Sequence, residues 1–100
     1  MPGRTRASED VEGRRWIVSG RVQGVGYRYF ARQAAQALGV RGWIRNLPDG
    51  GCEVQVAGSG ELLQRFQDEL RRGPRGSRVD DIDEERLVQV PDWQSFQIVF

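Results

Sequence analysis

The spacing of apolar residues changes along this chain, and the order of the changes restricts the folds that it can adopt. Around Trp16 and Val18, apolar and polar residues alternate, which is typical of a strand with one buried face. Between Tyr27 and Leu38 the apolar residues recur at helical spacing, and Gly39 follows where a helix C-cap is expected. The first half of the chain therefore begins with a strand that leads into an amphipathic helix.

The second half repeats this order with an added strand. Residues 40–46 and 52–56 predict two strands, joined as a hairpin by the turn-forming sequence NLPDGG. Ser59 is a suitable N-cap for a second helix, which is expected to end before a GPRG sequence. Residues 79–82 predict an edge strand, and residues 96–100 predict a short extra strand at the end. This order predicts an α+β fold of the ferredoxin-like, split βαβ type (βαββαβ), with two helices on one face of an antiparallel sheet.

Length and composition indicate one domain with a tail. One hundred residues, of which 38% are hydrophobic and 29% charged, suit a single globular core. Residues 1–13 are polar and show no period, so we expect a flexible N-terminal tail followed by a domain over residues 14–100. No apolar run is long enough to span a membrane, and no signal peptide is visible. The single cysteine, Cys52, allows no intrachain disulfide, so we expect a cytoplasmic protein. We also expect a monomer.

The charged residues exclude several kinds of chemistry. All 15 basic residues are arginine, and the sequence has no histidine. Schiff-base chemistry, a P-loop lysine, a histidine base and histidine metal ligands are therefore excluded, and the lone Cys52 excludes a thiolate cluster. The acidic residues 80–85 are interpreted as a charged edge strand rather than a metal site. We expect no metal and no cofactor, and the net charge of +1 gives no reason to expect a nucleic-acid or membrane partner.

Three glycines, Gly20, Gly24 and Gly26, stand where the first strand gives way to the first helix. They are explained by a tight turn, or by a backbone that curls its N–H groups around an anion at the helix N-terminus. Arg28 in the first helical turn adds a planar fork for two phosphate oxygens. The residues alone leave both interpretations open, and the second predicts a phosphate-binding loop from Gln23 to Arg28. A dinucleotide-binding fingerprint is excluded because its third glycine is missing.

Two longer motifs indicate a family. Residues 18–28, VSGRVQGVGYR, resemble the first signature of the acylphosphatases, and residues 42–58, GWIRNLPDGGCEVQVAG, resemble the second. The resemblance extends over residues 15–100. It implies hydrolysis of the carboxyl–phosphate bond of small-molecule acyl phosphates without metal or cofactor. By position, Arg28 matches the family's phosphate-binding arginine and Asn46 the asparagine that orients the attacking water. The loop whose backbone amides hold phosphate matches Gln23, Gly24, Val25, Gly26 and Tyr27.

The chain departs from the family pattern in small ways, and other functions remain to be weighed. Ile44 is bulkier than usual, Cys52 replaces a typical valine, and Gly51 adds a glycine to the turn, all of which concern strand packing. From the residues alone, Asn46 is accounted for by the turn before Pro48, and Cys52 by the core. The alternatives are a non-catalytic ligand-binding domain and an RNA-binding ferredoxin-like module. The latter needs outward aromatics on a strand, whereas GVGYRYF enters a helix.

Overall fold

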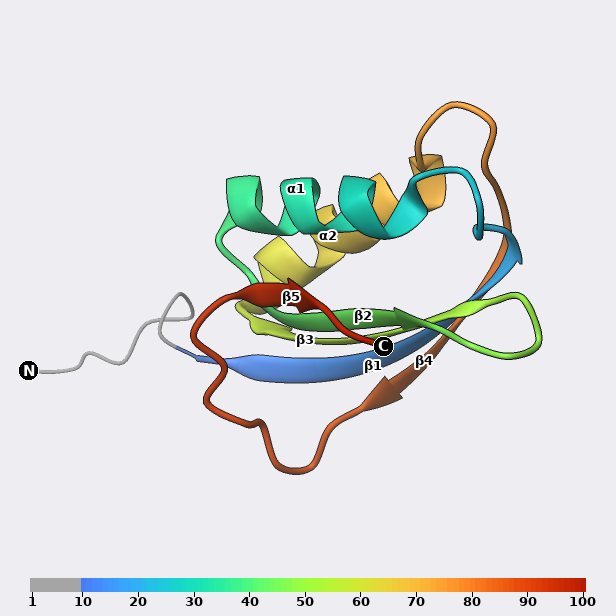
Figure 1. Ribbon diagram of the computed structural model, residues 1–100. Helices are drawn as coiled ribbons and strands as arrows, with labels where there is room; N and C mark the ends of the chain where they lie inside the picture. Colours follow the sequence, from blue (N-terminus) through green and yellow to red (C-terminus); the bar gives the residue numbers. More distant parts are fainter. Residues whose placement is uncertain (1–9) are drawn as a thin grey trace, which may run out of the picture.

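Two helices lie side by side on one face of a five-stranded sheet in the computed structural model, which describes residues 10–100 (Figure 1). The strands alternate apolar and polar side chains, so each presents one apolar face to the helices. The expected βαββαβ order is confirmed, with β5 as the extra strand. In chain order the elements are β1 (Glu12–Arg21), α1 (Tyr27–Leu38), β2 (Arg41–Asn46), β3 (Cys52–Gly58), α2 (Gly60–Arg72), β4 (Arg78–Arg86) and β5 (Phe96–Ile98).

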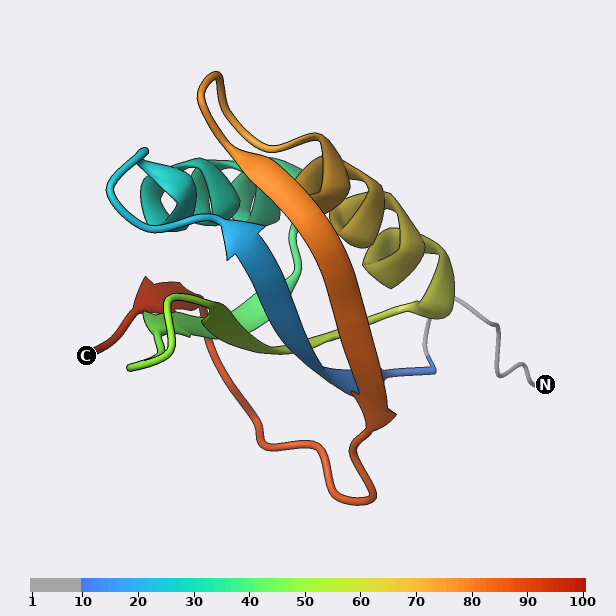
Figure 2. The ribbon, with the colours of Figure 1, turned by 90° about the vertical axis from the view of Figure 1, so that its right-hand side faces the viewer.

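The four strands of the βαββαβ order pair antiparallel, as expected, and the extra strand β5 adds a parallel pair at one edge, so the sheet as a whole is mixed. The strand order is β4-β1-β3-β2-β5, and only the β2–β5 pair is parallel, with Gly42 opposite Phe96. After β4, residues 87–95 cross below the sheet to its other edge (Figures 1 and 2). The chain therefore enters β5 in the direction opposite to β4, which is the direction of β2.

The strands differ from their expected bounds at both ends of the chain. Strand β1 includes Glu12 and Gly13, which the sequence assigned to the tail, because both pair with the end of β3. The rest of the expected tail, residues 1–9, lies outside the described residues. At the other end β5 stops at Ile98, so Phe100 does not continue the predicted strand and its side chain is 96% exposed.

The core fills the space between the helices and the sheet. Trp16 of β1 packs against Phe66 of α2 with ring centroids 5.8 Å apart, and Phe66 meets Phe96 of β5 edge-on at 5.5 Å. The Tyr27 hydroxyl donates to the Leu70 carbonyl oxygen at 2.7 Å, which ties the start of α1 to α2. These contacts fix the position of the N-terminus of α1 above the sheet. Among residues 10–100, no helix is long and apolar enough to cross a membrane.

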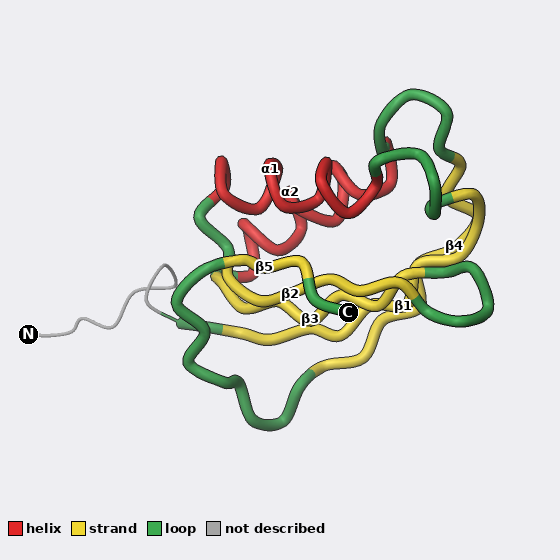
Figure 3. The backbone as a smooth tube through the Cα atoms, viewed as in Figure 1, coloured by secondary structure: helices red, strands yellow, loops and turns green. Residues whose placement is uncertain are grey.

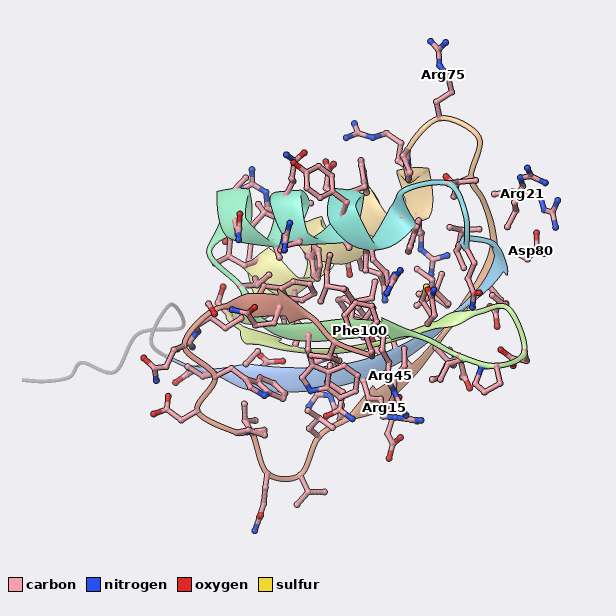
Figure 4. All side chains as sticks on the ribbon, viewed as in Figure 1. Arg15, Arg21, Arg45, Arg75, Asp80 and Phe100 are labelled. Atoms are coloured by element: carbon pink, nitrogen blue, oxygen red, sulfur yellow. The ribbon has the colours of Figure 1, made fainter. Side chains whose placement is uncertain are left out.

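The opposite face of the sheet carries a buried carboxylate. Glu53 of β3 is only 3% exposed, and it forms ion pairs with Arg15 and Arg45 on the neighbouring strands. Both arginines are labelled in Figure 4. Arg15 Nε donates to Glu53 Oε2 at 2.6 Å, and Arg45 Nε donates to Oε1 at 2.8 Å. Burial alone would raise the pKa of Glu53, but hydrogen bonds from Arg15, Arg45 and Gln55 outweigh it and hold this pKa below its usual range.

Candidate active site

The loop before α1 has the backbone shape that an anion-binding loop requires. Gly24 and Gly26 both have φ of 76°, in the left-handed region that other residues rarely adopt. A Cβ atom at either position would meet no other atom within 4 Å, so the backbone angle, and not lack of space, favours glycine there. The expected mixture of φ signs is confirmed. Helix α1 starts at Tyr27, immediately after this turn.

The N-terminus of α1 is left without a cap, in contrast to that of α2. Helix α2 begins with Ser59 accepting a hydrogen bond from the Leu62 N–H, and Glu61 lies in its first turn. In α1 the N-cap position is Gly26, which has no side chain to accept a bond, and the first turn contains no acidic residue. Within residues 10–100, the N–H groups from Gln23 to Tyr29 donate to no other protein group. They and the positive end of the helix dipole are therefore available to an anion.

Arg28 adds a full positive charge to this helix end. No acidic side chain within residues 10–100 forms an ion pair with it, whereas Arg15 and Arg45 are both paired. Its guanidinium lies 5.3 Å from the centroid of the Phe100 ring, an arrangement that leaves the N–H groups of its planar fork unpaired. A cation at a helix N-terminus is electrostatically unfavourable, and a bound anion would offset this cost.

Gln23 connects the loop to the turn between β2 and β3. Its side-chain Nε2 donates to the carbonyl oxygens of Leu47 and Gly51, at 2.8 and 2.9 Å. The loop and the turn lie at the same end of the sheet (Figure 3). Sequence reasoning assigned only the backbone of Gln23 to the loop. Its side chain has a different task, which is to hold the loop beside the strand end that carries Asn46.

Asn46 is the last residue of β2 and lies half-buried at the floor of the site. The Cys52 thiol donates to Asn46 Oδ1, with Sγ and Oδ1 3.3 Å apart, which directs the amide nitrogen away from this contact. Burial raises the pKa of the Cys52 thiol to about 11, although the nearby Arg28 guanidinium lowers it in part. The thiol is therefore protonated at neutral pH and fully buried. The interpretation of Cys52 as a core residue is confirmed.

These groups surround one cavity of about 310 Å³. Of the residues expected from the sequence, it is lined by Gln23, Gly24, Gly26, Tyr27, Arg28 and Asn46. Val25 does not line it, because its side chain packs against the core, which leaves only its backbone for the loop. Four lining residues were not expected from the sequence: Val22, Tyr29, Ile98 and Phe100. The sequence does contain a signal for Tyr29, because it is an aromatic residue next to Arg28 that does not belong to the apolar face of α1.

The groups that line this cavity are suited to two chemical roles, which are to bind an anion and to position a water molecule. The uncapped helix end and Arg28 can hold a doubly charged oxyanion through oriented donors. Asn46 approaches the same space from the sheet with an uncharged amide, which is suited to holding a water molecule at a fixed angle. No Asp, Glu or His is among the residues that line the cavity within the described part of the chain.

Comparisons with known proteins point to a single family. The acylphosphatase family model matches residues 14–98. An acylphosphatase from Koribacter versatilis is 45% identical over 91 residues, which cover 91% of this chain and 83% of that protein. An acylphosphatase from Solibacter usitatus is 48% identical over 87 residues, which cover 87% and 90%. The crystal structure of acylphosphatase from Bacillus subtilis matches with a TM-score of 0.86 at 36% identity, covering 89% of this chain and 99% of that one.

Proposed function

The chain belongs to the acylphosphatase family, so it hydrolyses the carboxyl–phosphate bond of small acyl phosphates, and we propose that Arg28 and Asn46 are its catalytic residues. In this reaction a water oxygen attacks phosphorus, the bond from phosphorus to the carboxyl oxygen breaks, and the bonding electrons leave with the carboxylate. The observation that carries the proposal is the meeting of an uncapped helix end, an unpaired arginine and an asparagine around one cavity.

Arg28 and the loop hold the phosphoryl group. The unpaired N–H groups from Gln23 to Arg28 bind its equatorial oxygens, and the Arg28 guanidinium takes two oxygens through its fork. These oxygens carry the charge in the transition state of phosphoryl transfer, so donors already in place stabilise it with little rearrangement. The left-handed glycines, Gly24 and Gly26, support this role because they allow successive N–H groups to converge.

Asn46 positions the attacking water. With Oδ1 accepting from the Cys52 thiol, the amide Nδ2 is the group that Asn46 has for the water oxygen. A water held in this way keeps a lone pair directed at phosphorus, in line with the bond that breaks. Gln23 supports this alignment, because its side chain joins the phosphate loop to the turn that follows Asn46.

The proton of the water leaves without help from a protein base. An acyl phosphate has a carboxylate leaving group, which needs no strong acid to protonate it. Since no acidic residue or histidine within residues 10–100 lines the cavity, we assign the proton to the phosphoryl oxygens or to solvent. We also propose that the enzyme acts in the cytoplasm as a monomer, needs no metal or cofactor, and requires neither nucleic acid nor a membrane.

A phosphate-release assay with benzoyl phosphate tests the role of Arg28. Arg28→Ala should lower kcat/KM by about 10³-fold, and Arg28→Lys should also fail, because an ammonium group cannot replace the fork. Arg65→Ala, which removes an exposed arginine from α2, is the matched control and should retain wild-type rates. Wild-type rates should also be the same with and without a chelator. Retention of more than a tenth of the activity by Arg28→Ala would show that the phosphate is held elsewhere.

A further inference from the structure

The cavity has a second wall, which the hydrolysis of the phosphate bond does not use. The loop, Arg28 and Asn46 provide its polar part, whereas Tyr29, Ile98 and Phe100 provide an apolar part. Tyr29 is 55% exposed and Phe100 96% exposed, so two large apolar side chains are kept in contact with solvent at the mouth of the same cavity. Apolar surface gathered at a concave site is a common mark of ligand binding.

The cavity is larger than a phosphoryl group requires. Its volume of about 310 Å³ is within the range of small-molecule pockets, which is roughly 300–1,000 Å³. A phosphoryl group has one phosphorus atom and a few oxygens, so it fills only part of this space. The remainder lies beside the aromatic residues, because the polar part of the wall is taken up by the phosphate contacts. The acyl group of the substrate, which is joined directly to the phosphoryl group, has to occupy it.

Both aromatic rings line the cavity together with Arg28. The Arg28 guanidinium lies 5.3 Å from the centroid of the Phe100 ring, and Tyr29 follows Arg28 directly in α1. The Tyr29 ring is fixed from the outside by Arg32, whose guanidinium lies 5.3 Å from its centroid, and by Gln33, whose amide donates to its hydroxyl at 3.2 Å. A ring restrained in this way loses little conformational entropy when it contacts a substrate.

We propose that Tyr29 and Phe100 bind the acyl group and select for flat aromatic acyl phosphates over small polar ones. The inference rests on the proposed function, since it places the phosphoryl group on Arg28. Aromatic rings gain from stacking or edge contacts with another ring, which an acetyl or carbamoyl group cannot make. Among the lining side chains only that of Arg28 is charged, and the phosphoryl group engages it, so an acyl group with its own carboxylate finds no positive side chain left there.

The test compares kcat/KM for benzoyl phosphate with kcat/KM for acetyl phosphate. In Phe100→Ala and in Tyr29→Ser, the ratio of the two values should fall by about two- to tenfold, the range expected for one aromatic contact. Phe100→Leu keeps an apolar side chain without a ring and should also lower the ratio, whereas Phe100→Tyr should keep it. Val88→Ala, which removes a fully exposed apolar side chain outside the cavity, is the control and should keep the wild-type ratio.

An unchanged ratio in both Phe100→Ala and Tyr29→Ser would overturn the inference. If the two kcat/KM values of Phe100→Ala also fall by the same factor, Phe100 acts only by holding Arg28. Failure of the proposed function gives a different result, because Arg28→Ala would then hydrolyse both substrates at wild-type rates. A Phe100→Tyr enzyme with the wild-type ratio, beside a Phe100→Leu enzyme with a lower ratio, supports recognition by the ring over recognition by bulk alone.

Discussion

Replacing Gln23 with methionine removes the connection between the two halves of the active site while keeping a side chain of similar length. One amide nitrogen donates to the carbonyl oxygens of Leu47 and Gly51, at 2.8 and 2.9 Å. The loop before α1 and the strand end that carries Asn46 are far apart in the sequence, and these two bonds hold them together. The variant therefore tests whether catalysis depends on the alignment of Arg28 and Asn46.

The effect on stability is expected to be small. A hydrogen bond of this kind contributes roughly 0.5–1.5 kcal/mol net. Both carbonyl groups keep another donor, because Leu47 O also accepts from the Gly50 N–H at 3.1 Å and Gly51 O from the Leu47 N–H at 2.8 Å. Neither is left unpaired when Gln23 is replaced, so we expect the free energy of unfolding to fall by about 1–2 kcal/mol.

The effect on catalysis is expected to be larger. A displacement of about 1 Å between reacting groups costs on the order of 100-fold in rate, so kcat of Gln23→Met should fall about 10- to 100-fold. Urea denaturation measures the stability, and phosphate release from benzoyl phosphate measures kcat and KM. Gln64→Met, which changes an exposed glutamine of α2 that donates to Asp68 at 3.0 Å, is the matched control and should leave kcat unchanged. A Gln23→Met enzyme with the expected loss of stability but a wild-type kcat would refute the reasoning.

Two further predictions follow from the same geometry. Asn46→Ala should lower kcat by at least tenfold, while the inhibition constant of inorganic phosphate should stay within about twofold of the wild-type value, because Arg28 and the loop still bind the anion. A large loss of phosphate inhibition in this variant would mean that Asn46, and not Arg28, binds the phosphate. Glu53→Gln should destabilise the fold by roughly 1–3 kcal/mol at pH 7, since hydrogen bonds from Arg15 and Arg45 lower the pKa of Glu53 in the folded state despite its burial. That stabilisation is complete above the unfolded-state pKa of about 4.5, and it is lost as the pH falls through the lower folded-state pKa. Urea denaturation at pH 7 and pH 3 measures this. The difference in free energy of unfolding between Glu53→Gln and wild type should be smaller at pH 3 than at pH 7.

Much of the fold was predictable because its signals are local. Helix α2 shows this well: its apolar spacing and the Ser59 cap are both visible in a short stretch of sequence, and both are present in the structure. The direction of β5 was not predictable, since it depends on the path of residues 87–95 across the sheet. Alternation also placed Phe100 in a strand, although it lies beyond the end of β5 against Arg28. The alternation of apolar and polar residues predicts which face of a sheet a side chain lies on, but it does not predict where the hydrogen-bonded pairing of the strand ends.

The site itself was predictable only where a motif carries its chemistry. The glycines and Arg28 lie within one short stretch, so their cooperation is visible in the sequence. The contact between Gln23 and the turn is not, because its acceptors are backbone carbonyls 24 and 28 residues away. Any residue type presents the same carbonyl group, so no side-chain pattern marks such a partner. The contact of Cys52 with Asn46 is hidden for a related reason, since a buried cysteine is usually explained by packing alone.

The strand topology explains why one cavity receives groups from three separate segments. Strands β1 and β2 both pair antiparallel with β3, which lies between them, so they run in the same direction, and β5 runs parallel to β2. The carboxyl ends of β1, β2 and β5 therefore lie at the same end of the sheet. The end of β1 leads into the anion loop, the end of β2 carries Asn46, and the end of β5 leads to Phe100. Strand β4 runs in the opposite direction and contributes nothing to the cavity lining. The proposed contacts with phosphate, water and the acyl group therefore all depend on strand direction, and the proposed acyl recognition requires the parallel placement of β5.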